Sequence, residues 1–114
     1  MPTDLTKDAD TVLCVLYRTY LERRKNKLPK STAKEFDSFA GMQEAFFSKW
    51  LVEDVEETCN ELKRADFLEF KVFITGDTSP ITLSDKGIIY MENRFPNGLA
   101  SVVDFLSKII GPFL

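Results

Sequence analysis

The sequence predicts a small α+β protein that is mostly α-helical and carries one short β-hairpin. Apolar residues recur at helical spacing along most of the chain, which favours amphipathic helices. The segment 67–75 instead alternates apolar with polar residues and is rich in aromatic and β-branched side chains, as strands are. A strand pattern also changes abruptly into a helix pattern at Ser84. We therefore expect a hairpin in the second half of the chain, with helices on both sides of it.

The composition is that of one globular domain. The chain has 114 residues, of which 44% are apolar and 29% charged, so it can bury one core but is too short for two. The formal net charge of -3 argues against a protein that coats nucleic acid nonspecifically. Any contact with nucleic acid must therefore come from a local basic patch.

The two cysteines, Cys14 and Cys59, fall on the apolar stripes of predicted helices. We therefore expect buried free thiols instead of a disulfide, which favours a reducing cytoplasm. No charged segment followed by an apolar one opens the chain, and no apolar run approaches the roughly 18 residues of a membrane span. The expected protein is cytoplasmic and has no membrane partner.

The first predicted helix covers residues 4–25, with Thr3 or Asp4 as its N-cap. Its apolar face is formed by Leu5, Ala9, Val12, Leu13, Leu16, Tyr20 and Leu21. A basic loop follows at 23–31, where five of nine residues are Lys or Arg and Pro29 closes the run.

The segment 32–50 predicts one or two short helices that are interrupted near Gly41. A longer helix is predicted over 51–67, because one stripe of it is apolar and the opposite face is acidic. The stripe consists of Val52, Val55, Cys59 and Leu62, and the outward residues are Glu53, Asp54, Glu56, Glu57, Asn60 and Glu61.

The hairpin is predicted to pair a strand at 67–75 with a short strand at 81–83, through a turn at 76–80. A two-stranded hairpin is marginal alone, so its inward side chains should be buried against the helices. These are Phe70, Val72, Ile74, Ile81 and Leu83.

Ser84 is predicted to be the N-cap of the helix that follows the hairpin. The apolar Leu83 before it can form a hydrophobic staple with Ile88, and Asp85 favours the helix dipole. Gly87 allows the start of this helix to pack closely. The helix should continue through Phe95 and stop at the Pro-Asn-Gly sequence 96–98.

A last apolar helix is predicted over 99–110, with Asn97 as its cap and Gly111-Pro112 as its terminator. Its apolar residues are Leu99, Val102, Val103, Phe105, Leu106, Ile109 and Ile110, with Phe113 beyond. Three kinds of cover are open: packing along the first helix, pairing with a second copy in a homodimer, and insertion at a membrane surface. The third is disfavoured because Lys108 is the only basic residue of the helix and Asp104 opposes it.

The region 51–95 carries a resemblance to a known family. An amphipathic helix is followed by a hairpin, and residues 81–95, ITLSDKGIIYMENRF, are similar to the ending LT-x-KG-x-x-Y of winged helix-turn-helix domains. Within that class the chain most resembles the small YjcQ-like proteins of Gram-positive bacteria and their prophages. The resemblance implies a winged-helix domain at 1–96, an added C-terminal helix at 97–114 for packing or dimerisation, and a DNA-binding or transcription-regulator-like function.

No motif for catalysis is found. The chain has no histidine, which removes the usual base of a Ser or Cys nucleophile and the commonest metal ligand. It also has no CxxC, HExxH, GxGxxG or phosphate-binding Gly-Lys loop. The i, i+4 carboxylate pairs Glu53/Glu57 and Glu57/Glu61 are best interpreted as a solvated helix face. We therefore expect a non-enzymatic protein without a metal or cofactor.

Binding of double-stranded DNA is the function that the resemblance implies, yet the acidic start of the helix 51–67 would repel phosphates. The basic residues lie elsewhere and would grip the phosphates, while a few polar residues would lie near bases. The predicted phosphate contacts are Arg23, Arg24, Lys25, Lys27, Lys30, Lys49, Lys63, Arg64 and Lys71, and the predicted base contacts are Ser48, Trp50 and Asn60. The basic loop is alternatively an ordinary solvated surface.

A second hypothesis is a protein-interaction module that uses the same scaffold and does not bind DNA. Its acidic helix would then be an exposed surface or a docking site for a basic protein partner. Salt distinguishes the two hypotheses, because only binding through several phosphates must weaken steeply as salt is added.

Overall fold

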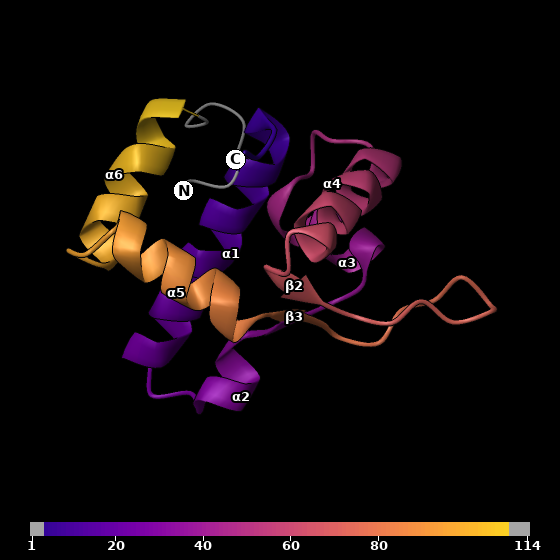
Figure 1. The fold of residues 1–114 in the computed structure, drawn as a ribbon, viewed down its shortest axis with the longest axis horizontal. Coiled ribbons are helices and arrows are strands. Elements are labelled where there is room, and N and C mark those ends of the chain that lie inside the picture. The colour runs from indigo at the N-terminus through magenta and orange to yellow at the C-terminus, as the bar shows by residue number, and fades with distance from the viewer. Residues whose placement is uncertain (1–3, 110–114) are drawn as a thin grey trace.

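The computed structural model describes residues 4–109 and shows a mostly helical α+β fold with a small antiparallel sheet, as predicted (Figure 1). The elements in chain order are α1 (Lys7–Lys25), α2 (Lys30–Ala33), β1 (Glu35–Phe36), α3 (Phe39–Phe46), α4 (Val52–Arg64), β2 (Leu68–Glu69), β3 (Ile81–Leu83), α5 (Asp85–Arg94) and α6 (Leu99–Ile109). No helix within the described residues is long and apolar enough to cross a membrane.

Helix α1 is the centre of the fold. It contacts α2, α4, α5 and α6, and every residue from 11 to 17 is buried (Figure 1). An α-helix that is covered all round can be apolar on more than one face, which explains why its pattern is wider than a single stripe. The helix begins at Lys7, and its N-cap is Thr6, whose Oγ1 accepts a hydrogen bond from the Ala9 amide at 3.1 Å. The prediction that Thr3 or Asp4 is the N-cap was therefore wrong. Thr3 itself lies outside the described residues.

The segment between α1 and α4 differs most from the sequence prediction. It contains the short helix α2, the two-residue strand β1 and the helix α3, and Gly41 lies inside α3 instead of interrupting a helix. The break falls at residues 34–38, where Ser38 caps α3 by accepting a hydrogen bond from the Gly41 amide at 3.2 Å. Gly41 is needed for space, because a Cβ atom there would lie 2.4 Å from Oδ2 of Asp37.

The predicted amphipathic helix is confirmed as α4. Val55, Cys59 and Leu62 are buried on one side. The helix ends at Arg64, three residues before the predicted limit. The chain turns there because Asp66 adopts a left-handed conformation with φ 65°, which Asp tolerates better than most residues.

The sheet has the order β1-β3-β2, with β3 in the middle and both pairings antiparallel. Thr82 of β3 lies opposite Glu35 on one side and Glu69 on the other. The predicted hairpin is therefore present, but β1 adds a strand that the sequence did not reveal. A two-residue strand is too short to show alternation.

Beyond β2 and β3 the hairpin continues as a long arm, which we define as residues 70–79 (Figure 1). Phe70 at its base is buried, but Val72 is 55% exposed and Ile74 is fully exposed. The prediction that Val72 and Ile74 are buried was wrong, because the arm extends past the part of the sheet that the helices cover. The predicted burial of Ile81 and Leu83 is confirmed.

The change from strand to helix at Ser84 is confirmed. The Ser84 hydroxyl accepts a hydrogen bond from the Gly87 amide at 2.9 Å and donates one to the Asp66 carbonyl at 2.6 Å. Gly87 permits a close approach, since a Cβ atom there would lie 2.7 Å from the carbonyl oxygen of Phe67. Leu83 and Ile88, the predicted staple residues, are both buried in the core.

Helix α6 packs along α1, which is the first of the three kinds of cover considered above. Val102 and Leu106 are buried, whereas Val103 is 45% exposed. Gly98, and not Asn97, directly precedes the helix and accepts a hydrogen bond from the Val102 amide at 3.3 Å. The predicted apolar residues Ile110 and Phe113 and the predicted terminator lie outside the described residues.

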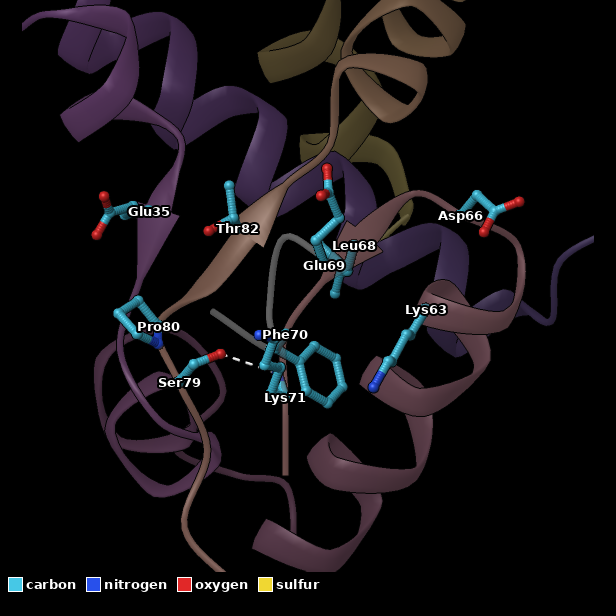
Figure 2. A pocket seen from close by; sticks show the side chains of 10 residues that line it. All are labelled: Glu35, Lys63, Asp66, Leu68, Glu69, Phe70, Lys71, Ser79, Pro80 and Thr82. Atoms are coloured by element: carbon cyan, nitrogen blue, oxygen red, sulfur yellow. Dashed lines mark hydrogen bonds between the residues drawn. The ribbon is translucent and has the colours of Figure 1, made fainter. Parts of the chain in front are cut away.

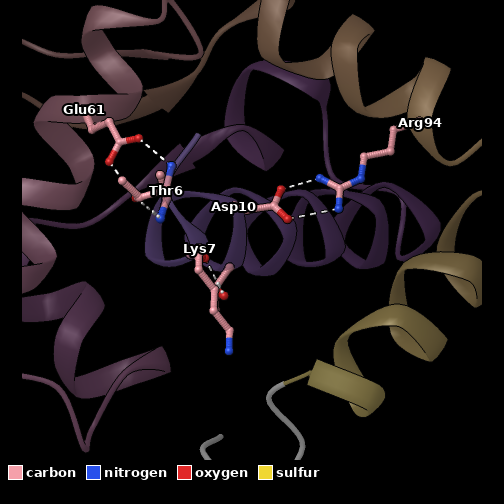
Figure 3. Close-up of polar contacts among 7 residues, drawn as sticks. Thr6, Lys7, Asp10, Glu61 and Arg94 are labelled. Atoms are coloured by element: carbon pink, nitrogen blue, oxygen red, sulfur yellow. Dashed lines mark hydrogen bonds and ion pairs between the residues drawn. The ribbon is translucent and has the colours of Figure 1, made fainter. Parts of the chain in front are cut away.

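Two polar contacts attach α1 to its neighbours (Figure 3). Asp10 of α1 accepts two hydrogen bonds from the Arg94 guanidinium of α5. At the start of α1, the Glu61 carboxylate of α4 accepts hydrogen bonds from the Thr6 amide at 2.9 Å and the Thr6 hydroxyl at 2.7 Å. Both contacts are charge-assisted and join segments far apart in the sequence, so they fix how α1 sits against α4 and α5.

Candidate interaction face

The exposed side of α4 is acidic. Glu53, Asp54, Glu56 and Glu57 are all exposed, because the apolar stripe of the same helix turns toward the core. None of these four carboxylates forms an ion pair within residues 4–109, whereas Glu61 is held by Thr6. The first two turns of α4 therefore present uncompensated negative charge to the solvent.

Beside α4 lies the arm, which has its own backbone hydrogen bonds. The Ser79 amide donates to the Lys71 carbonyl at 2.9 Å, and the Phe73 amide donates to the Asp77 carbonyl at 2.8 Å. Gly76, with φ 93°, allows the tight reversal at the tip. The arm is thus an ordered hairpin, and it exposes Val72, Phe73 and Ile74.

Aromatic contacts hold the base of the arm against the helices. The Phe70 ring meets the Phe39 ring of α3 edge to face, with 5.5 Å between their centroids. Lys63 Nζ of α4 lies 4.6 Å from the centroid of the same Phe70 ring. These contacts fix the direction in which the arm leaves the body.

A groove of about 590 Å³ runs over the outer face of the sheet, beside the end of α4 (Figure 2). Its lining carries both signs of charge, with Glu35, Asp66 and Glu69 set against Lys63 and Lys71. In Figure 2 the Ser79 hydroxyl accepts a hydrogen bond from the Lys71 amide, at 2.8 Å. Because the charges nearly balance, the groove favours neither an anionic nor a cationic ligand.

A second hollow, of about 390 Å³, separates the arm from α3 and α4. We call it the acidic cleft, and its lining residues are Ser38, Phe39, Ala40, Val52, Glu56, Gly76, Asp77 and Thr78. Both of its charged residues are carboxylates. The cleft is not visible in the sequence, because its lining comes from three separate segments.

The predicted basic loop is largely engaged with its own chain. The Arg23 guanidinium donates hydrogen bonds to the carbonyls of Ala33 and Glu35, at 3.2 and 2.6 Å. Arg24 donates to the Leu28 carbonyl at 3.1 Å, and Lys30 lies 3.7 Å from the Asp85 carboxylate. Arg23 thus holds β1 and α2 beside α1. Lys25 and Lys27 of this loop are exposed.

The other predicted DNA contacts lie on or near α4. Ser48 and Lys49 are exposed in the turn before α4, and Trp50 packs on Phe47 with 4.9 Å between ring centroids. The remaining four are half-buried Asn60 and exposed Lys63 and Arg64 on α4, and exposed Lys71 on the arm. Figure 1 shows α2 and the end of α1 at one edge of the molecule and α4 at another, so the basic loop and the residues on or near α4 belong to two separate parts of the fold.

Neither cysteine is a reactive group in the folded chain. Cys14 and Cys59 are free and buried, as predicted, and burial raises the pKa of each thiol to about 12. Near neutral pH both are therefore protonated and non-nucleophilic. Within the described residues, His, Cys, Asp and Glu form no group of three or more that could hold a metal ion.

One signal in the sequence points to the arm. The strand pattern at 67–75 spans nine residues, whereas its partner at 81–83 spans three. A strand that is longer than its partner must continue past the sheet, so this excess length indicates a projecting hairpin.

No family model, curated protein or solved structure matches the chain.

Proposed function

We propose that this chain is a non-enzymatic protein-interaction module built on a winged-helix scaffold. The element order supports the scaffold: helix, strand, two helices, two further strands and the helix α5, with α2 between α1 and β1 and with α6 added after α5. The sheet order β1-β3-β2 also supports it, because it puts α4 beside a hairpin that extends as a wing would. The buried thiols and the absence of histidine leave no evident nucleophile and base pair.

The observation that carries the proposal is the acidic outer face of α4. In helix-turn-helix proteins that bind DNA, the helix at this position enters the major groove with its N-terminal residues toward the base edges. Here that part of the helix presents Glu53, Asp54, Glu56 and Glu57. A carboxylate within 4 Å of a phosphate costs about 1 kcal/mol in water, and four of them would oppose docking in this way.

The arm supports the same proposal. DNA-binding proteins hold phosphates with Lys and Arg, whereas the arm exposes Val72, Phe73 and Ile74 and carries one lysine, Lys71. Aromatic and apolar side chains at the centre of a surface patch are typical of protein interfaces. An ordered apolar hairpin beside an acidic helix therefore fits a protein surface better than a nucleic acid.

DNA binding is the second candidate, and one observation favours it. Lys63 at the end of α4 and Lys71 on the arm line the same groove, and Arg64 follows Lys63. Such a group can hold a phosphate backbone without reading bases. Binding of this kind would be independent of sequence and steeply dependent on salt.

A fluorescence anisotropy titration with mixed-sequence duplex DNA at about 50 mM and about 200 mM salt separates the two candidates. We expect no complex with a Kd tighter than about 10⁻⁴ M at either salt concentration. This value is the weak limit of nonspecific DNA binding through basic contacts. In parallel, selection from a random peptide display library should enrich peptides that bind the full chain.

A tight DNA complex whose affinity falls about fortyfold or more between the two salt concentrations, as three phosphate contacts require, contradicts the protein-interaction proposal. It would instead support the second candidate, and replacing Lys63, Arg64 and Lys71 by Ala should then flatten the salt dependence. Failure of the library to enrich any peptide also counts against a protein-interaction module.

A further inference from the structure

The acidic cleft combines three features in one hollow. Its charged lining is negative, from Glu56 on α4 and Asp77 on the arm. Its apolar lining comes from Phe39 of α3 and Val52 of α4, of which Phe39 is largely buried. Its volume of about 390 Å³ lies in the range of small-ligand sites and is large enough for a few side chains of a ligand.

Thr78 on the arm adds a polar group without a partner. Its Oγ1 atom is inaccessible to solvent and has no hydrogen-bond partner among the described residues. Buried polar atoms are normally satisfied, and Thr78 lines the cleft, so a rotation of its side chain toward the cleft would let this unpaired hydroxyl gain a hydrogen bond to a ligand there.

We propose that the acidic cleft binds a cationic peptide segment of a partner protein. Lys or Arg side chains of the segment pair with Glu56 and Asp77, an apolar side chain packs on Phe39 and Val52, and the peptide backbone reaches the Thr78 hydroxyl. This inference rests on the proposed protein-interaction function and specifies its partner.

Charge complementarity selects this occupant over others. A phosphate or an acidic peptide would meet two carboxylates in the cleft and further carboxylates along α4. A second copy of this chain is a poorer source of the cations, because Arg23, Arg24 and Lys30 of its basic loop contact their own chain and leave Lys25 and Lys27 of that loop for such a contact. A lysine- or arginine-containing segment of another protein faces neither obstacle.

The test is a titration of the isotope-labelled full chain with the synthetic peptide Gly-Lys-Leu-Arg-Lys-Gly, followed by amide chemical shifts in NMR spectra. Two control peptides replace its basic residues by Glu, or its Leu by Gly. We expect saturable shifts at Phe39, Val52, Glu56 and Thr78 with the first peptide and none with the Glu-containing peptide. The Gly variant should bind more weakly, because the apolar contact is lost.

Matched charge reversals localise the site. Glu56→Lys in the cleft should weaken binding about tenfold, because it replaces attraction by repulsion. Glu92→Lys on α5 changes the net charge equally and should weaken binding less than about twofold, because α5 does not line the cleft and salt screens exposed charges outside it. Asp77→Lys should reproduce the effect of Glu56→Lys on a separate element, and circular dichroism checks that each variant is folded.

Several results overturn the inference. These are the absence of binding, equal binding of the Glu-containing peptide, equal effects of Glu56→Lys and Glu92→Lys, or shifts centred on the groove at Lys63 and Lys71. Shifts at the cleft that follow the concentration of the protein alone also overturn it, because they identify a second copy as the occupant. The protein-interaction function itself is contradicted by different results, namely a tight salt-dependent DNA complex or a library selection that enriches no peptide. Failure of this inference and failure of the proposed function are therefore distinguishable.

Discussion

The helical body and the hairpin arm are held in place by different means. In the body, residues 11–17 of α1 are buried on every side, and the contacts of Asp10 with Arg94 and of Thr6 with Glu61 join distant segments. The arm depends on its own backbone hydrogen bonds and on the ring contacts of Phe70 at its base. Stability is therefore set mainly by the body, and the arm contributes little to it.

The largest effect that tests this contrast is a buried charge. Leu83→Asp places a carboxylate at a fully buried position of the central strand and should cost about 4 kcal/mol or more, enough to unfold a marginally stable domain. Val72→Asp makes the same kind of change on the arm, where the side chain is 55% exposed, and should cost less than about 1 kcal/mol. Thermal unfolding followed by circular dichroism measures both. Similar melting temperatures for the two variants would remove the distinction.

Glycine substitutions sharpen the contrast. Gly87→Ala puts a Cβ atom 2.7 Å from the backbone carbonyl oxygen of Phe67, so α5 must shift, at a cost of about 2 kcal/mol. Gly76→Ala at the tip of the arm meets no atom within 4 Å. Only the backbone strain of an alanine at φ 93° destabilises this variant, by about 1 kcal/mol. Chemical denaturation measures the two costs. A larger cost at Gly76 would mean that the tip is more constrained than its surroundings show.

Alkaline pH should destabilise the body through its thiols. Burial raises the pKa of Cys14 and Cys59 from 9.0 to about 12, so between these values the unfolded chain loses thiol protons that the folded chain keeps. The contribution of the thiols is thus constant below pH 9 and decreases as the pH rises above it. We expect a free energy of unfolding that is about 3 kcal/mol lower at pH 10 than at pH 8, because each of the two thiols contributes about 1.4 kcal/mol.

A labelling experiment separates this explanation from general alkaline effects. In the native chain both thiols should react slowly with a disulfide reagent at pH 8, whereas Ile74→Cys on the exposed arm should add one fast-reacting thiol. Fast reaction of Cys14 or Cys59 in the folded chain would contradict their burial.

The smallest effect is expected at the contact between α1 and α5. Arg94→Ala leaves the half-buried Asp10 carboxylate without its partner and removes a cation from the Phe105 ring, at about 1 kcal/mol because both partners keep some contact with water. Lys108→Ala breaks the exposed pair with Asp104 and should cost at most a few tenths of a kcal/mol. Equal effects in denaturant titrations would show that Asp10 and Arg94 do not fix α5.

Much of the body was predictable because its signals are local. The apolar stripes predicted α1, α4, α5 and α6, and the cap at Ser84 was confirmed together with the close packing of Gly87. The strand β1 was not predictable, since it has two residues and exists only through its pairing with β3. Gly41 predicts a helix break, but it lies inside α3, where a Cβ atom would meet the side chain of Asp37 before the helix.

The candidate site was predictable only in part. The acidic face of α4 follows from the sequence, because it is the complement of an apolar stripe on the same helix. The acidic cleft does not, since Phe39, Glu56 and Asp77 meet only once the arm has a direction in space. The contacts of Arg23 are also set by the fold. The sequence predicts a phosphate contact for this residue, whereas folding places its guanidinium against the carbonyls of Ala33 and Glu35.

The self-contained hydrogen bonding of the arm has an evolutionary consequence. Because Ser79 and Lys71 bond to each other and Val72 to Ile74 are exposed, substitutions between them disturb few contacts of the body. Homologous chains can therefore diverge in this segment, in length as well as in residue type, while Phe70 and the sheet stay the same. Successive substitutions in the arm therefore need not pass through unstable intermediates.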